Sequence, residues 1–139
     1  MMTMIHSFWA YLVLALLIIV VIKAVTSLKK EFKDIDLRLA LFTLIVSHIQ
    51  LILGLGVYFS SPAFKSLKAN GMKGMPSETR LLAVEHPLMM LIAIILITIG
   101  YSKQKKKTTN EGKFKTVAIF YGLALLLVLS RIPWGQWLG

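Results

Sequence analysis

Four long apolar stretches dominate the chain, at about Ile5–Ile22, Leu37–Phe59, Leu81–Tyr101 and Val117–Ile132. Apolar residues run continuously through them and do not alternate with polar ones, which argues against β-strands. A membrane-spanning helix needs about 20 mostly apolar residues, and backbone in lipid must satisfy its own hydrogen bonds. We therefore predict an all-α fold, an up-down bundle of four transmembrane helices. The helices are expected at about residues 5–25, 37–60, 79–101 and 115–132 of one integral membrane domain, residues 1–139.

The amino-acid composition supports a membrane location and excludes several classes of protein. Hydrophobic residues make up 57% of the chain, and the mean hydropathy is +0.75. A soluble domain is roughly 45–50% apolar, so the excess must face lipid. Disorder is excluded because it requires low hydrophobicity. The chain has no cysteine, which excludes disulfides, iron–sulfur clusters and thiolate zinc sites.

Basic residues predict the orientation of the bundle. The formal net charge is +10, but the basic residues bracket the apolar stretches, so a membrane surface explains them better than nucleic acid does. Eleven of the 16 Lys and Arg lie at the connections after the first and third helices, which the positive-inside rule places in the cytoplasm. Both termini and the Ser60–Arg80 connection then face outward. Its prolines and glycines predict a loop without a long element.

Three histidines provide the candidate chemistry, each in a different predicted helix. His6 begins the first helix, His48 lies near the middle of the second, and His86 lies in the outer part of the third. A single intramembrane histidine is more often a hydrogen-bonding partner between helices. Three of them on three helices favour metal ligation, because imidazoles from facing helices hold haem in helical bundles.

Small and polar residues form a stripe on one face of the second helix: Thr43, Ser47, Gln50, Gly54 and Tyr58. His48 lies one residue, about 100° around the helix, from Ser47. Gly54 removes side-chain bulk just outward of His48. This absence of bulk provides either room for a flat macrocycle or close helix packing.

A second stripe, on the third helix, contains His86, Met90, Ala93, Ile97 and Gly100. Pro87 lacks an N–H and disfavours helix at His86, so we expect a kink there, with the preceding turn still helical. Met90 is a candidate axial ligand of haem iron, although a methionine in a span is more often a core residue.

Two charged residues lie near the outer edge of the spans. Arg131 is a candidate partner for haem propionates, because a guanidinium matches carboxylate geometry. Glu85 is a candidate for orienting His6 by accepting an imidazole N–H. The chain has no HExxH, nucleophile elbow or Gly-rich phosphate loop, and no CxxCH for covalent haem. We therefore assign no catalytic residue.

Four segments together resemble a family of small four-helix bacterial membrane proteins described as cytochrome b-like. They are His6-Ser7, His48-x-Gln50-Leu51-x-x-Gly54-Leu55-x-x-Tyr58-Phe59, Glu85-His86-Pro87-Leu88-Met89-Met90 and Ile132-Pro133-Trp134. The resemblance covers nearly the whole chain. A weaker one is to the four-helix halves of haem A synthase, but Glu85 adjacent to His86 departs from the synthase pattern, so its catalytic role is not carried over. The family resemblance implies a multi-pass protein of the bacterial inner (cytoplasmic) membrane that binds haem b non-covalently, with His48 and His86 as ligands.

Alternatives remain open for the two histidines that would bind haem iron and for the function of the protein. We favour His48 with His86, because each lies on a stripe of small residues, and the alternative pair is His6 with His86. The favoured function is electron transfer as a cytochrome-like subunit associated with a respiratory complex, with a membrane redox partner or quinone and no catalytic activity of its own. The alternatives are a structural or assembly subunit without cofactor, and a non-haem metal enzyme built on His6, Glu85 and His86.

Overall fold

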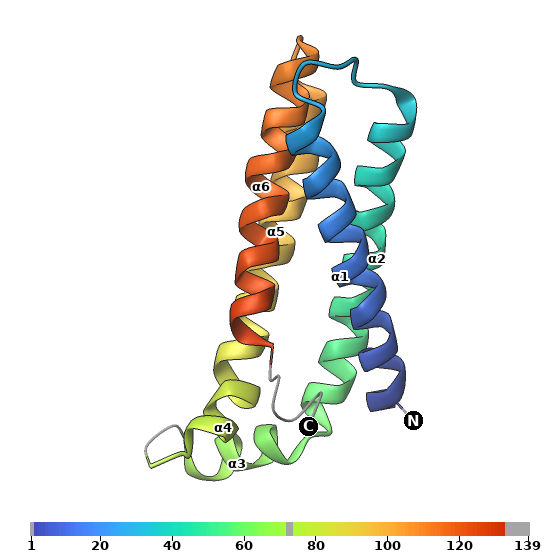
Figure 1. The fold of residues 1–139 in the computed structure, drawn as a ribbon. Coiled ribbons are helices and arrows are strands. Elements are labelled where there is room, and N and C mark those ends of the chain that lie inside the picture. Colours follow the sequence, from blue (N-terminus) through green and yellow to red (C-terminus); the bar gives the residue numbers. More distant parts are fainter. Residues whose placement is uncertain (1, 72–73, 133–139) are drawn as a thin grey trace.

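The chain folds into a bundle of long helices (Figure 1). The computed structural model describes residues 2–71 and 74–132, and within these ranges it contains helices and no strand. The helices are α1 (Met2–Thr26), α2 (Asp34–Phe59), α3 (Pro62–Asn70), α4 (Ser77–Arg80), the π-helix η1 (Leu81–Glu85), α5 (His86–Lys105) and α6 (Asn110–Arg131). Four segments are long and apolar enough to cross a membrane: Met4–Thr26, Asp34–Phe59, Leu81–Lys105 and Asn110–Arg131. The predicted all-α, multi-pass fold is confirmed.

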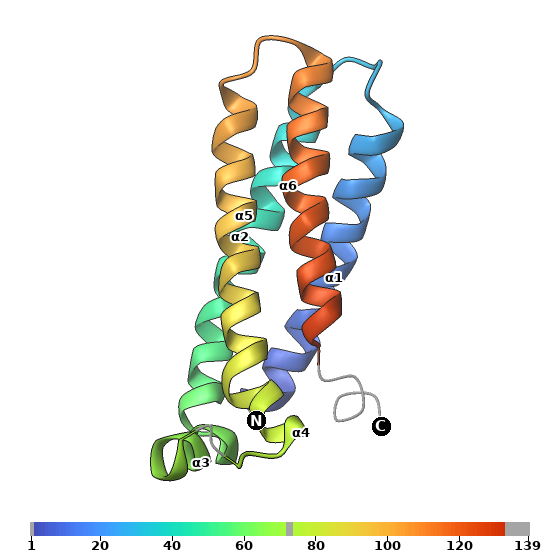
Figure 2. The same cartoon turned by 90° about the vertical axis from the view of Figure 1, so that its left-hand side faces the viewer.

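The four long helices form a square in which α1 and α5 are diagonal. α1 packs on α2 and α6, and α5 packs on the same two helices (Figures 1 and 2). The α1–α2 and α5–α6 connections lie together at one end, which we call the basic end because it carries most of the Lys residues. The start of α1, the end of α6, α3 and α4 lie at the other end, which we call the α3 end. This arrangement is the predicted up-down bundle.

The interior contains the two stripes predicted from the sequence. Thr43 and Ser47 of α2 are buried, as are Ala93, Ile97 and Gly100 of α5. A methyl group at Gly100 would lie 2.5 Å from Cβ of Phe120, so only glycine permits this approach of α5 and α6. Across the bundle, the buried Tyr121 hydroxyl of α6 donates to the Ala40 carbonyl of α2, 2.9 Å away.

Two of the helices that begin earlier than predicted, α2 and α6, do so because polar residues cap and extend them. α6 begins at Asn110 rather than near 115, since the Thr109 hydroxyl accepts a hydrogen bond from the Gly112 amide at 3.0 Å. α2 begins at Asp34, and the Asp36 carboxylate accepts from the Lys33 amide at 2.9 Å. Asp36 is buried and pairs with Lys23 Nζ at 2.6 Å, which ties α1 to α2 at the basic end.

The Ser60–Arg80 connection contains the nine-residue helix α3, where the sequence predicted a loop. The Ser61 hydroxyl accepts from the Phe64 amide at 3.1 Å, and Pro62 occupies the first turn. Gly71 ends the helix with a φ of +69°. A serine cap, a proline at the first helical position and a glycine after the last one are known helix signals. The prolines and glycines that predicted a loop thus mark the ends of a helix.

Candidate functional site

His86 is positioned by an irregular turn that Pro87 requires. Pro87 has no N–H, so the carbonyl of Ala83, four residues earlier, loses its usual helical donor. The Tyr58 hydroxyl of α2 donates to this buried carbonyl at 2.7 Å. The turn before Pro87 is a π-helix, in which the His86 amide donates to the Leu81 carbonyl. The prediction of a helical turn before Pro87 is confirmed, whereas the role of Tyr58 was not predicted.

The hydrogen bond of His86 determines which of its ring nitrogens is free. Nδ1 lies 2.9 Å from the carbonyl oxygen of Arg131, in the last turn of α6. Because a carbonyl oxygen only accepts, the proton must sit on Nδ1 and the lone pair on Nε2. Carbonyls in the last turn of a helix lack helical donors, so His86 also caps α6. This is the arrangement in which a histidine presents Nε2 to a metal while its other nitrogen is held.

His6 enters the same end of the bundle from α1. The Gln50 amide nitrogen of α2 donates to the His6 carbonyl at 3.0 Å. The His6 ring occupies the space left by Gly54, where a methyl group would lie 3.2 Å from the ring carbon Cε1. The space left by Gly54 is thus occupied by a side chain of α1. The imidazole Nδ1 is buried and has no hydrogen-bond partner among the described residues.

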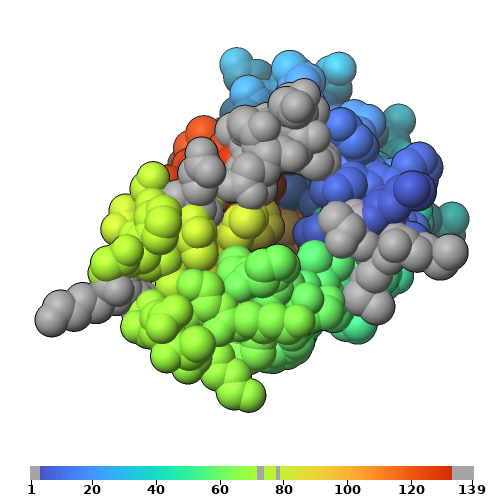
Figure 3. All heavy atoms as spheres, turned by 90° about the horizontal axis from the view of Figure 1, so that it is seen from below, coloured from blue at the N-terminus to red at the C-terminus, as the bar shows by residue number. Residues whose placement is uncertain are grey.

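His6 and His86 approach each other from diagonal helices. His6 lies near the start of α1 and His86 begins α5, so both lie at the α3 end, where α1 and α5 each pack mainly on α2 and α6. Viewed from the α3 end, α1 and the start of α5 face each other across the middle of the molecule (Figure 3). In Figure 1 the α1–α2 pair and the α5–α6 pair spread apart toward this end. Both histidines are half-buried at this end, whereas His48 is exposed.

Three buried polar atoms around these two histidines lack partners among the described residues. They are His6 Nδ1, Gln50 Oε1 and Arg131 Nε. The Nη1 of Arg131 donates to the carbonyl of its neighbour Ser130 at 3.0 Å, which leaves Nε unused. Buried polar atoms are rarely left unsatisfied. They come from α1, α2 and α6 at the α3 end and are available to a polar or ionic ligand group, although buried atoms without hydrogen-bond partners also occur elsewhere in the described ranges, on Ser47 and Gln104.

His48 lies elsewhere and points away from the interior. Its neighbour Ser47 is 1% exposed, whereas His48 itself is on the exposed side of α2. Its Nδ1 lies 2.8 Å from the Leu44 carbonyl of the same helix, and Nε2 lies 3.5 Å from the Thr98 hydroxyl of α5. Thr98 is 12 residues from His86, roughly 18 Å along the helix at about 1.5 Å per residue. His48 therefore lies well away from His86, whereas His6 lies at the same end of the bundle as His86.

The remaining candidates have ordinary surroundings. Glu85 pairs with Arg80 at 3.0 Å, so its carboxylate is engaged there rather than with His6. Within the described residues no group of three or more His, Asp or Glu side chains is arranged to hold a metal ion. Met90 is half-buried on α5. Pro133 and Trp134 lie outside the described residues.

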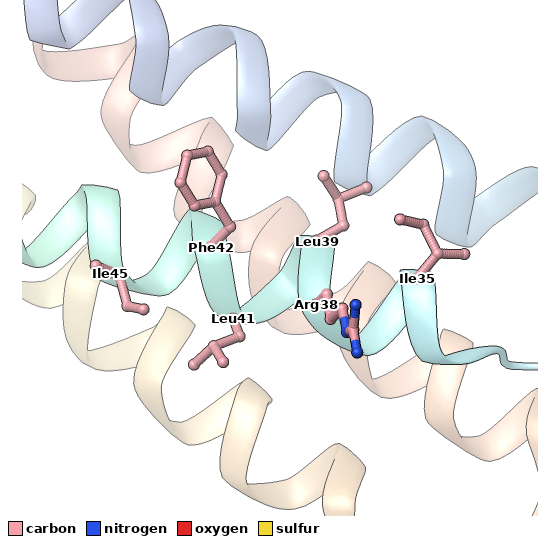
Figure 4. Close-up of a pocket in the computed structure, with 6 residues that line it drawn as sticks. All are labelled: Ile35, Arg38, Leu39, Leu41, Phe42 and Ile45. Carbon is pink, nitrogen blue, oxygen red and sulfur yellow. The ribbon is translucent and has the colours of Figure 1, made fainter.

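A shallow, open hollow lies away from the histidine pair, on the outer face of α2. It has a volume of about 420 Å³ and is lined by Ile35, Arg38, Leu39, Leu41, Phe42 and Ile45 (Figure 4). All six belong to α2. Arg38 lies toward the basic end and pairs with Asp34 at 3.1 Å. In a membrane this face contacts lipid.

Comparisons with known proteins add no family to these observations. No protein-family model, curated protein or solved structure matches the chain. The functional conclusion therefore depends on the chemistry of the site.

Proposed function

We propose that this protein binds haem b in the membrane through His6 and His86. The observation that carries the proposal is the His86–Arg131 hydrogen bond, which holds the proton on Nδ1 and leaves Nε2 available. Two imidazoles from diagonal helices are a donor set suited to haem iron, and two nitrogens alone are too few for a closed zinc site. His48, favoured from the sequence, is replaced in this proposal because its ring is exposed on the lipid-facing side.

The unpartnered polar atoms fit the other needs of this cofactor. Arg131 Nε is free to donate to a propionate carboxylate, in the role that the sequence suggested for Arg131. The Gln50 side chain is close enough to the His6 ring to interact with it. Its Oε1 would accept a hydrogen bond from His6 Nδ1, so that the lone pair of His6 lies on Nε2, as in His86, and Arg131 Nε remains as the atom available to the cofactor. The space between the two helix pairs must widen to admit the macrocycle.

Haem b would supply one-electron transfer, and the chain supplies its ligands and its membrane location. We propose that the protein resides in the bacterial inner membrane and exchanges electrons with a membrane redox partner or quinone, as a subunit associated with a respiratory complex. No catalytic residue is proposed.

An optical spectrum tests the proposal directly. The detergent-purified protein, expressed with added haem precursor, should show a Soret band and sharp α and β bands after reduction with dithionite. His6→Ala and His86→Ala should each lose these bands, whereas the matched variant His48→Ala should keep them. A colourless wild-type protein would exclude the proposal. Loss of the bands in His48→Ala, with retention in His6→Ala, would restore the pair favoured from the sequence.

A structural or assembly subunit without cofactor is the second candidate. The observations that favour it are the two bonds between helices, from Gln50 to the His6 carbonyl and from His86 to the Arg131 carbonyl. Such bonds hold membrane helices together without any ligand. This candidate expects a colourless protein and only mild effects of single histidine substitutions.

A further inference from the structure

The seam between α2 and α5 carries a pair of polar side chains, His48 and Thr98, that both contact lipid. Both residues are exposed, and His48 Nε2 lies 3.5 Å from Thr98 Oγ1. His48 is 14 residues from the start of α2, roughly 21 Å along a helix of about 39 Å at about 1.5 Å per residue. The pair is therefore near the middle of the hydrocarbon layer, where a polar group without a partner is costly.

Each member of this pair has already used its own proton within its own helix. Nδ1 of His48 donates to the Leu44 carbonyl at 2.8 Å, so neutral His48 carries its lone pair on Nε2. The Thr98 hydroxyl donates to the Ile94 carbonyl at 2.8 Å, so its oxygen also faces outward as an acceptor. Two acceptors lie side by side, and neither has a good donor. A ligand for this place must bring a hydrogen-bond donor.

We propose that the His48–Thr98 pair binds the hydroxyl of a hydroquinone, the reduced form of a membrane quinone. The depth of the pair selects this ligand, because the polar groups of phospholipids remain in the headgroup region, outside the hydrocarbon core. A hydroquinone is an apolar ring that carries O–H donors and dissolves within that core. Its oxidised form has only carbonyl acceptors at the ring oxygens and cannot satisfy Nε2.

The hollow on α2 gives the rest of such a molecule a place to lie. Ile45, Leu41 and Arg38 follow His48 at spacings of three, four and three residues toward the basic end, on one side of the helix. The hollow of about 420 Å³ that they help to line is apolar except for Arg38 (Figure 4). An apolar tail would lie along this surface, with the ring at His48. Binding here involves neither His6 nor His86 and does not rest on the haem proposal.

The test compares duroquinol with duroquinone on the full chain in phosphatidylcholine vesicles. Equilibrium dialysis against protein-free vesicles of the same composition separates binding from partition into lipid. We expect the wild-type protein to bind duroquinol at least fivefold more tightly than duroquinone. His48→Phe should lower duroquinol affinity at least fivefold, and Thr98→Val should lower it by a smaller factor, with neither changing duroquinone affinity.

Two control variants separate binding at this seam from effects elsewhere in the bundle. Thr26→Val removes another exposed threonine that bonds a helical carbonyl and should leave duroquinol affinity unchanged. His6→Ala should also leave it unchanged, so failure of the haem proposal and failure of this one are distinguishable. Equal affinity for the two compounds, or full duroquinol binding by His48→Phe, would overturn the inference. A change of oligomeric state in His48→Phe would also overturn it, because the hydrogen-bond donor to His48 would then belong to a second copy of the chain.

Discussion

The interior of the α3 end and the lipid-facing seam of α2 and α5 each hold a histidine whose Nδ1 proton is bound by a backbone carbonyl. The distances are similar, 2.9 Å for His86 and 2.8 Å for His48. The carbonyl that accepts from His86 belongs to another helix, whereas the one that accepts from His48 belongs to its own. The Nδ1 bond of His86 consequently joins α5 to α6, while the Nδ1 bond of His48 stays within α2. Whether a histidine joins two helices therefore depends on which helix contributes the carbonyl that accepts its Nδ1 proton.

The same two regions differ in what they leave unsatisfied. Around His86 and His6 the atoms without partners are a mixed set, a ring nitrogen, an amide oxygen and a guanidinium nitrogen. At His48 and Thr98 both free positions are acceptors. Because Gln50 Oε1 can accept from His6 Nδ1, the guanidinium nitrogen of Arg131 is what suits a ligand with a carboxylate, whereas a pair of acceptors suits a ligand with a hydroxyl. The two regions therefore favour different ligands within one bundle.

The largest expected effect concerns the turn that aims His86. Tyr58→Phe removes the donor to the buried Ala83 carbonyl, and leaving a buried acceptor unpaired costs about 1–3 kcal/mol of stability. Pro87→Ala restores an N–H that can reach this carbonyl within the helix, so Tyr58→Phe should cost less in that background. Unfolding by SDS in mixed micelles, run as a double-mutant cycle, measures the difference. An equal loss in both backgrounds would mean that Pro87 is not the reason for the Tyr58 bond.

A smaller effect is expected at Gly54, beside which the His6 ring lies. Gly54→Ala would bring a methyl group to 3.2 Å from the His6 ring and force the ring to shift. We expect the Kd for haem, measured by titrating the haem-free protein at free haem concentrations below Kd, to rise about fivefold, which corresponds to roughly 1 kcal/mol. The matched variant is Gly122→Ala, whose methyl group would meet Val21 at an ordinary 4.0 Å. The Kd for haem should be normal in that variant, and a similar rise in both would point to general loss of packing.

The smallest effect compares the two histidines directly in the protein without haem. His86→Leu removes a bond between helices, which is worth about 0.6 kcal/mol on average in membrane proteins. His48→Leu should cost nothing or stabilise, because the Leu44 carbonyl keeps its helical donor and a polar ring leaves the lipid. SDS unfolding of the two variants gives the comparison. A larger loss for His48→Leu than for His86→Leu would contradict the distinction between an inner and an outer histidine.

The helices and the sides they bury could be predicted, because these features depend on residues close together in the sequence. The four spans, the up-down order and the two inward stripes follow from hydropathy and from the helical repeat. Helix α3 carried its signals in Ser61, Pro62 and Gly71, although the same residue types are also typical of loops. The role of Tyr58 was less accessible, since nothing near it in the sequence shows that Pro87 leaves a carbonyl 25 residues away without a donor.

The sequence by itself determined that this chain crosses a membrane four times and carries three histidines within or beside its spans. Only the tertiary structure decided which histidines meet. One residue along a helix is about 100° of rotation, enough to separate the buried Ser47 from the exposed His48. Whether His6 of α1 reaches His86 of α5 depends on the packing of both helices against α2 and α6. The spacing of polar and apolar residues predicts the side of a helix on which a residue lies. A contact between diagonal helices, in contrast, depends on how all four helices pack.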